Sequence, residues 1–419
     1  MLYYLFKWLH SIGLPGSGVF QYISFRSAAA FVLSVLISMF IGRGFIRFLR
    51  RKQIGEEVRD LGLAGQNEKA GTPTMGGLII IAAILIPVLL VCELRNVYVL
   101  LMLFTTVWLG LLGFADDYIK VFKHNKEGLS PRKKLIGQII LGVLVGVVVY
   151  FHPDAKISEK NRTSDVVYTP VVTALQVENQ EAAQTPKIFG EPHHSTKTTI
   201  PFVKDNEFDY SWFTRWLGDE TGKWSCIIYI LIVVFIIAAV SNGANLTDGL
   251  DGLATGTTSV VAVGIAILAY VSGNVIFANY LNIMYIPNSG ELVIFISAVV
   301  GACLGFYWWN CFPAQVFMGD TGSLTLGGIV AVSCVIIRKE LLLPILCGIY
   351  LAEAVSVIMQ RSYFKYTKKK YGEGRRIFLM APLHHHFQKK GMHEAKIVQR
   401  FIVISLLLAV LTVATLKVR

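Results

Sequence analysis

Charged residues are scarce in this chain of 419 residues. Asp, Glu, Lys and Arg make up 16% of it, whereas a soluble domain contains roughly 25%. Cysteine is also rare, and the six cysteines show no CxxC spacing, which argues against a disulfide framework or a zinc site and favours apolar packing. The first 25 residues lack the basic segment, apolar core and small-residue cleavage site of a signal peptide, so we expect none. The scarcity of charge is typical of a membrane protein.

The chain contains long apolar runs that could form membrane-spanning segments. A helix that crosses a bilayer takes roughly 17–25 mainly apolar residues, and a strand of a membrane barrel alternates over about ten. The runs do not alternate, which predicts an all-α integral membrane protein, a bundle of about ten transmembrane helices. The predicted spans are Ala28–Ile46, Met75–Cys92, Val97–Ala115, Leu135–Phe151, Ser225–Val240, Leu253–Val271, Leu292–Trp309, Leu324–Ile337 (the shortest), Leu341–Met359 and Ile397–Leu416.

The net charge of +12 is unevenly distributed along the chain. Residues 152–223 hold 8 Lys/Arg against 11 Asp/Glu, while Lys and Arg crowd the loops after the first, third and ninth spans. Short loops rich in Lys and Arg stay in the cytoplasm. We therefore expect loops after odd-numbered spans to be cytoplasmic and both termini to lie outside. This parity makes residues 152–223 an extracytoplasmic insertion in one polytopic domain that takes up residues 1–419.

Polar motifs gather in the loops predicted to be cytoplasmic. They precede the second span and follow the third, fifth, seventh and ninth: Lys69–Gly77, Asp116-Asp117, Ser241–Gly252, Asn310 with Phe317–Ser323, and Pro382–Phe387. Acids at a membrane boundary are costly unless they are paired, metal-bound or hydrated, so by default they mark function. The extracytoplasmic loops show no comparable set. The convergence of five motifs on one face predicts an active site there.

The residue types in these motifs indicate phosphoryl transfer. Five acids share the surface and would repel one another without a cation: Asp116, Asp117, Asp248, Asp251 and Asp320. Carboxylate oxygens with substrate phosphates suit Mg²⁺, glycines allow close approach to phosphate, and histidine can act near neutral pH. Each motif alone has an ordinary explanation, such as a solvated helix end or a tight turn. Together they describe a site that positions and neutralises phosphate.

In these motifs and their order, the chain resembles the bacterial phospho-N-acetylmuramoyl-pentapeptide-transferase family, part of the polyprenyl-phosphate N-acetylhexosamine-1-phosphate transferase superfamily. The resemblance runs through nearly all spans and cytoplasmic loops, but we expect it to stop at about residues 152–224, where the family usually has a shorter connection. It implies a homodimer of ten-helix subunits in the bacterial inner membrane, with its site facing the cytoplasm. It also implies Mg²⁺-dependent transfer from UDP-MurNAc-pentapeptide to undecaprenyl phosphate, giving lipid I and UMP, with no nucleic-acid partner.

The resemblance further implies roles for particular residues. Asp320 would bind Mg²⁺, and Asp116 and Asp117 would lie beside the lipid phosphate, with Asp116 as the candidate base. The implied diphosphate site consists of Lys69, Lys133, Asn245, Asp248 and His385. The implied uridine pocket consists of Gly249, Leu250, Asp251, Asn310 and Phe317, with Phe317 stacking on uracil. The remaining substrate-binding residues are Asn242, Gln360, His384 and His386. Of all these, the catalytic set is Asp116, Asp117, Asp248, His385 and Lys69.

Other activities fit the sequence less well. A sister transferase that moves GlcNAc-1-phosphate to the same lipid shares the aspartates, but Pro382–Phe387 fits the muramoyl type better; this enzyme is the open alternative. A CDP-alcohol phosphatidyltransferase needs Asp-Gly-x-x-Ala-Arg, and the stretch after Asp251 lacks that Arg. A transporter would place polar sites at the bilayer midplane between internal repeats, and the sequence shows no repeat.

Overall fold

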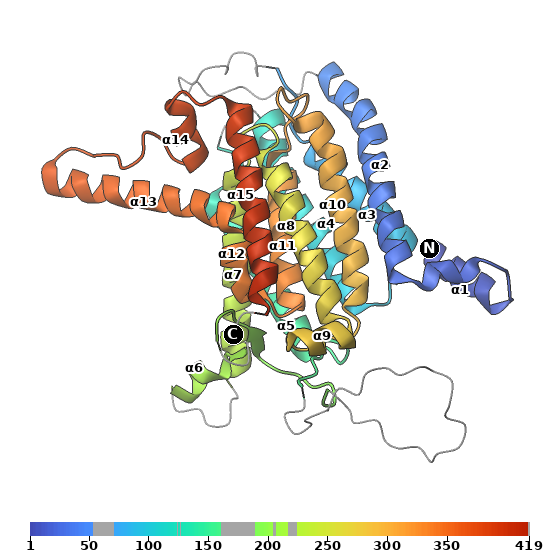
Figure 1. The fold of residues 1–419 in the computed structure, drawn as a ribbon. Coiled ribbons are helices and arrows are strands. Elements are labelled where there is room, and N and C mark those ends of the chain that lie inside the picture. Colours follow the sequence, from blue (N-terminus) through green and yellow to red (C-terminus); the bar gives the residue numbers. More distant parts are fainter. Residues whose placement is uncertain are drawn as a thin grey trace, which may run out of the picture.

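The computed structural model describes residues 1–52, 71–123, 125, 127–160, 189–203, 207–216 and 224–417. Eight helices within these ranges are long and apolar enough to cross a membrane, and a bent helix pair makes a ninth span if counted as one. They run side by side in an upright bundle (Figure 1). The eight are α2 (Ile23–Arg51), α4 (Val97–Phe122), α5 (Pro131–Phe151), α7 (Ser225–Thr247), α8 (Leu253–Ser272), α10 (Gly290–Asn310), α11 (Gly319–Ile336) and α15 (Glu394–Thr415). The predicted all-α membrane bundle is confirmed, and its count of about ten spans is approximate.

Local sequence signals explain where some of these helices begin. Asn96 precedes α4, and its side-chain oxygen accepts a hydrogen bond from Tyr98 N at 2.9 Å, which caps the helix. Pro131 occupies the first position of α5, where its missing N–H costs nothing.

Two predicted spans differ from straight, full-length helices. The second is α3 (Gly77–Val91), which has only 15 residues. The ninth is divided into η4 (Glu340–Leu342) with α12 (Leu343–Leu346), and α13 (Gly348–Tyr371), and the two parts bend by 79°. α13 then leaves the bundle sideways (Figure 1). An apolar run predicts a span, but it does not show where the helix will break.

α11 lies at the centre of the bundle. In its most apolar stretch 89% of the residues are buried inside the protein, against 28% for α2. Small residues let its neighbours approach: a Cβ on Gly327 would lie 2.7 Å from Ser241 Cα of α7. This explains why the eighth predicted span looked short, because the polar residues of its first turn are surrounded by protein rather than lipid.

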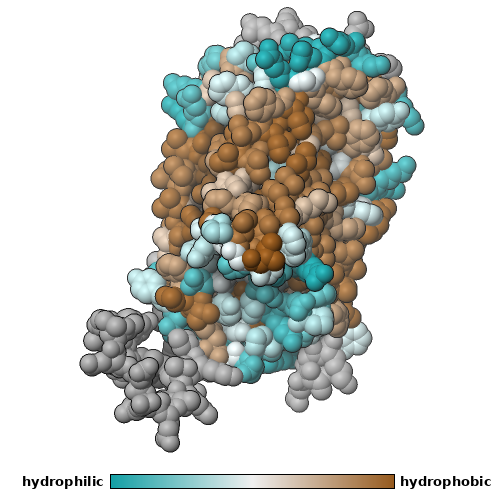
Figure 2. Space-filling model, turned by 90° about the vertical axis from the view of Figure 1, so that its right-hand side faces the viewer, coloured by the Kyte–Doolittle hydropathy of each residue, from teal (hydrophilic) through white to brown (hydrophobic). Residues whose placement is uncertain are grey.

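The outer surface of the bundle is apolar. Figure 2 shows a broad hydrophobic band with hydrophilic residues above and below it. Large exposed apolar side chains in the spans include Phe40, Phe235 and Leu407. A surface of this kind is matched to hydrocarbon, and helices satisfy their backbone polar groups internally.

The described part of the insertion docks onto one end of the bundle. β1 (Lys197–Thr199) pairs antiparallel with β2 (Glu207–Asp209), followed by α6 (Ser211–Trp216). Thr199 N donates to Arg338 O, just after α11, at 3.0 Å, and Tyr210 OH donates to Glu340 Oε1 of η4 at 3.2 Å. The short helices α1 (Leu2–Ser11), η1 (Ser17–Gln21) and α9 (Val275–Leu281) lie at this same end, opposite α14 (Leu383–Lys389) (Figure 1). Which membrane face each end meets stays a prediction.

Candidate active site

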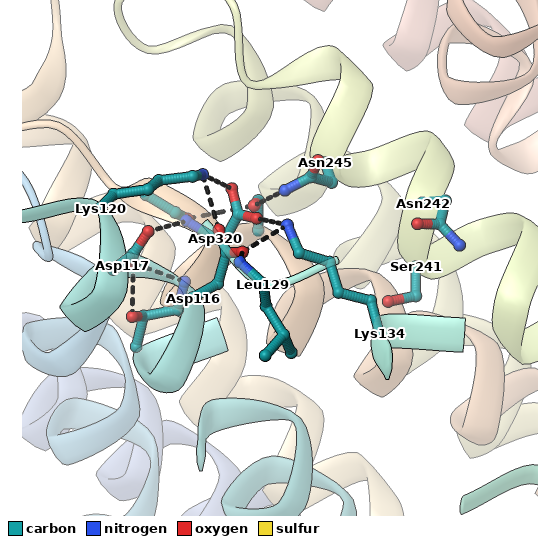
Figure 3. Close-up of polar contacts among 12 residues, drawn as sticks. Asp116, Asp117, Lys120, Leu129, Lys134, Ser241, Asn242, Asn245 and Asp320 are labelled. Carbon is teal, nitrogen blue, oxygen red and sulfur yellow. Dashed lines mark hydrogen bonds and ion pairs between the residues drawn. The ribbon is translucent and has the colours of Figure 1, made fainter. Parts of the chain in front are cut away.

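Three aspartates meet at the α14 end of the bundle. Asp116 and Asp117 lie near the end of α4, and Asp320 lies in the first turn of α11; one carboxylate oxygen from each falls within 4.8 Å of the others (Figure 3). Gly113 makes this approach possible, because a Cβ there would lie 2.3 Å from the Asp320 carbonyl oxygen. Asp116 and Asp117 are buried and Asp320 is half-buried. The structure therefore brings together the acids that the sequence placed 203 residues apart.

Two lysines form ion pairs inside this cluster. Lys120 Nζ lies 2.6 Å from Asp116 Oδ2 and 3.3 Å from Asp320 Oδ1. Lys134 Nζ lies 2.9 Å from Asp116 Oδ1 and 2.5 Å from Asp320 Oδ2 (Figure 3). Asp116 Oδ1 also accepts a hydrogen bond from Leu129 N at 2.6 Å. Sequence reasoning assigned neither lysine to the site.

The structure favours Lys134 over its neighbour Lys133. Lys133 is exposed on α5, while Lys134 points into the cluster. Helical spacing could have shown this, because Lys134 precedes the buried residues Gly137, Gln138 and Leu141 by three, four and seven positions and so shares their face. The predicted role of Lys133 at the diphosphate remains a prediction.

Asp117 forms no ion pair with Lys120 or Lys134 and instead caps α11. Its carboxylate accepts hydrogen bonds from Asp320 N at 3.1 Å, Thr321 N at 2.9 Å and Thr321 Oγ1 at 2.6 Å. A carboxylate at this position satisfies free N–H groups and complements the helix dipole. Gly319, at φ +73°, leaves room for it, since a Cβ there would lie 2.6 Å from Asp117 Oδ2. The adjacent aspartates thus have different surroundings, and Asp117 positions the backbone of Asp320.

The glycine-rich motif before α3 supports the same helix start. Phe317 N donates to Pro73 O, Gly76 N to Phe317 O and Gly77 N to Met318 O, each at 2.8 Å. These bonds hold the α10–α11 loop against the motif. Two distant sequence motifs therefore form one backbone frame around Asp320.

The end of α7 lies beside the aspartates. Asn245 Nδ2 donates to Ser323 Oγ of α11 at 2.9 Å, and Asn242 Nδ2 to Gln138 Oε1 of α5 at 2.8 Å. Figure 3 shows Asn245 on the side of the cluster facing α7. Asn245 therefore borders the cluster through Ser323, while Asn242 lies farther from it, and binding of substrate by either residue stays a prediction.

The other predicted residues at the end of α7 differ in how exposed they are to solvent. Asp248 is half-buried where α7 ends, Gly249 is exposed, and Leu250 is buried in a small apolar cluster. Lys69 lies outside the described residues.

Asp251 and Asn310 are buried and make contacts within the protein. Asp251 Oδ2 accepts from Ala314 N at 3.0 Å, and Asn310 Oδ1 accepts from Thr255 Oγ1 at 2.9 Å. Asn310 Nδ2 donates to Val316 O at 2.9 Å, beside the half-buried Phe317. The Asp251 bond joins the α7–α8 loop to the α10–α11 loop, and the Asn310 bonds join the end of α10 to α8 and to that second loop. They hold together the region predicted to bind uridine. Direct contact of either side chain with uridine stays a prediction.

His384 links the histidine motif to the α7–α8 loop. It is buried, and its ring packs so closely on Gly249 that a Cβ there would clash with it. Glu353, buried in α13, accepts from His384 N at 3.2 Å and lies 3.1 Å from His384 Nδ1. His385 Nδ1 is instead 2.7 Å from Gln388 Oε1. Glu353 therefore accepts hydrogen bonds inside the protein.

His386 and Gln360 fix the segment that follows α13. Leu379 N donates to His386 Nδ1 at 3.1 Å, and Phe378 N donates to Gln360 Oε1 at 3.0 Å. Burial and the nearby Lys390 hold the pKa of His386 below its ordinary value. The three histidines therefore have separate partners.

The aspartate cluster offers hard oxygen ligands to a divalent cation. Within the described ranges, Asp116, Asp117 and Asp320 form the group of side chains that could hold one. Asp116 Oδ2 is buried without a well-directed hydrogen bond, and its ion pair is with Lys120. The donor set fits a cation that prefers carboxylates and phosphate oxygens.

Known relatives align with this chain over its full length. The profile of Glycosyl transferase family 4 matches residues 195–338, and phospho-N-acetylmuramoyl-pentapeptide-transferase signature 1 matches residues 69–81. The phospho-N-acetylmuramoyl-pentapeptide-transferases of Flavobacterium johnsoniae, Flavobacterium psychrophilum and Parabacteroides distasonis are 58%, 56% and 55% identical to it, each over 100% of both chains. The alignments include residues 152–223, so the expectation that the resemblance stops there is wrong for these relatives. The chain belongs to the phospho-N-acetylmuramoyl-pentapeptide-transferase family.

Proposed function

We propose that this protein transfers phospho-N-acetylmuramoyl-pentapeptide from UDP-MurNAc-pentapeptide to undecaprenyl phosphate, giving lipid I and UMP. The observation that carries the proposal is full-length identity above 50% to enzymes named for this transfer. The acid–lysine cluster supports it, because phosphoryl transfer depends mainly on positioning and charge stabilisation.

The surroundings of Asp116 favour direct transfer. An oxygen of the lipid phosphate attacks the sugar-linked phosphorus, a P–O bond forms, and the bond from that phosphorus to UMP breaks, with UMP leaving. A phosphate monoester has a second pKa of about 6, so the lipid phosphate is already largely dianionic at pH 7 and needs little help from a base. The alternative route begins with attack by an aspartate. Both oxygens of Asp116 already contact lysines, which supports a positioning role.

Two positive side chains would receive the phosphates. Lys120 and Lys134 lie where the phosphate oxygens of donor and acceptor would meet the aspartates. Asp320 and Asp116 would hold Mg²⁺, which adds positive charge against the diphosphate when bound. Asp117 keeps the first turn of α11, and therefore Asp320, in place.

The site belongs at the cytoplasmic face of the bacterial inner membrane in this proposal. Its support is the excess of Lys and Arg in the loops at the α14 end of the bundle. The docked hairpin β1–β2 supports the proposal that the insertion is part of one domain, on the opposite face. The homodimer rests on family resemblance alone.

A donor comparison tests the reaction. Purified protein is supplied with undecaprenyl phosphate and either labelled UDP-MurNAc-pentapeptide or UDP-GlcNAc, and UMP release is followed. We expect kcat/KM for the muramoyl donor to be higher by a factor of about 10² or more, since a site can strongly reject an analogue that leaves its polar groups unpaired. Comparable use of UDP-GlcNAc would assign the sister activity and leave the fold unchanged.

A further inference from the structure

α13 and the segment that returns from it form an arm outside the bundle. α13 departs after a 79° bend and projects sideways (Figure 1). From Arg361 to Tyr371 its side chains are exposed except for Thr367. We call residues 361–376 the basic arm, because they include seven cations and one acid, Glu373.

The basic arm has a defined structure. Thr367 Oγ1 accepts from Arg375 N at 2.8 Å, which ties the returning segment to the helix. The ring of Phe364 packs on Gly374 so closely that a Cβ there would clash with it. At the base of the arm, Gln360 holds Ile377 N and Phe378 N, each at 3.0 Å. The charged side chains of the basic arm therefore project from an ordered backbone.

No cation of the basic arm has a carboxylate within 4 Å among the residues that the structure describes. The seven are Arg361, Lys365, Lys368, Lys369, Lys370, Arg375 and Arg376. Lys370 lies 5.3 Å from the ring centre of Tyr371, and Arg375 lies 4.8 Å from it. Lys120 and Lys134 in the site, by contrast, are each paired with two aspartates. Judged by the residues that the structure describes, the arm thus presents a positive surface whose cations form no ion pairs.

The exposed side chains of α13 change along the helix from apolar to aromatic and basic. Leu351, Val355, Ile358 and Met359 follow one face of α13 and are all exposed. Exposed tyrosines at positions 363, 366 and 371 come next and are interspersed with the cations. An apolar stripe followed by a stretch that mixes aromatic rings with lysines is typical of a helix that passes from hydrocarbon into the headgroup layer.

We propose that the basic arm binds the headgroups of anionic phospholipids in the leaflet that the active site faces. Clustered Lys and Arg beside a membrane segment attract anionic lipid, and the attraction decreases within a Debye length. The apolar stripe favours lipid over a soluble acidic protein, because it places the root of the arm in the bilayer. The inference depends on membrane placement and not on the proposed reaction.

A local probe tests this directly. Ser362 is exposed in the arm, so Ser362→Cys is labelled with a fluorophore in full-length protein whose half-buried Cys226 and Cys311 are replaced by Ser. The protein is placed in phosphatidylcholine nanodiscs with a trace of doxyl-labelled phosphatidylglycerol or doxyl-labelled phosphatidylcholine. We expect the anionic lipid to quench about threefold more than the neutral one, and the ratio to fall to about one in high salt.

Matched variants locate the effect. K365Q/K368Q/K369Q/K370Q should lower the quenching ratio to about one, whereas R47Q/R50Q/R51Q/K52Q, which removes four exposed cations at the end of α2, should leave it unchanged. A wild-type ratio of one, or an equal loss in both variants, overturns the proposal. So does an unchanged ratio in the arm variant with a raised KM for UDP-MurNAc-pentapeptide in pure phosphatidylcholine, which would assign the arm to the donor's peptide. Failure of the donor assay leaves this result untouched, since quenching needs no turnover.

Discussion

The ammonium group of Lys134 lies 2.5 Å from the carboxylate of Asp320, and the two residues are 186 positions apart in the chain. The pair joins α5 to α11 across the candidate active site (Figure 3). This ion pair places Lys134 in the candidate site, whereas its neighbour Lys133 is exposed.

Lys134→Gln should lower kcat by at least about tenfold, because removing a positioned charge from the reacting phosphates commonly costs that much or more. The rate of UMP release by the purified variants measures this loss. Arg132→Gln, at an exposed position nearby, is the matched control. Lys133→Gln discriminates between the two assignments. An equal loss in Lys133→Gln would restore Lys133 to the diphosphate site, and full activity in Lys134→Gln would remove Lys134 from it.

Asp117→Ala should destabilise the protein by about 1–2 kcal/mol, the usual cost of losing a side chain that caps a helix. The donors left without it are Asp320 N, Thr321 N and Thr321 Oγ1. Asp117→Asn keeps an acceptor oxygen and should recover part of the lost Tm, as measured by thermal unfolding in detergent. If Asp117→Ala melts with the wild type, Asp117 does not cap α11.

Removal of divalent cations should abolish UMP release, and Mg²⁺ should restore it. Asp320→Asn should lose activity while remaining folded, since an amide is a poor Mg²⁺ ligand. A Mg²⁺ titration of wild type and variant, with Tm as the folding control, measures both effects. Near wild-type turnover of Asp320→Asn in limiting Mg²⁺ would show that Asp320 is not the metal ligand.

Glu353→Ala should raise the KM for the donor and lower the Tm, because His384 N would lose its buried acceptor, at a cost of about 1–3 kcal/mol. Glu353→Gln keeps an acceptor for that N–H and should recover much of the Tm. Steady-state kinetics and thermal unfolding provide the two readouts. An unaltered KM in a destabilised Glu353→Ala protein would confine Glu353 to a structural role.

Cysteines at exposed positions on the two ends of the bundle test the orientation. In intact cells, an impermeant thiol reagent should label His194→Cys in the insertion but not Ser362→Cys in the arm, since parity places the insertion outside. The background again has Cys226 and Cys311 replaced. Labelling of position 362 alone would invert the orientation.

Hydrophobic length and charge bias were sufficient to predict the helical bundle and the gathering of polar motifs at one end of it. Val97–Ala115, for example, was predicted as a span and lies within α4. Such features are local: an apolar residue prefers hydrocarbon wherever its neighbours in space are, and helical spacing follows from the backbone. The prediction was least accurate for Leu341–Met359, where the structure bends at Cys347 between α12 and α13.

The different roles of adjacent motif residues follow from the tertiary structure and not from the sequence pattern. Asp116 and Asp117 are adjacent and identical in type, yet one contacts two lysines and the other caps α11. The same holds for Lys133 and Lys134, of which one reaches the aspartates. Neighbouring positions on a helix point about 100° apart, so their roles depend on which helices pack beside them. That packing depends on contacts between residues far apart in the chain, such as Gly113 with Asp320, which no local pattern records.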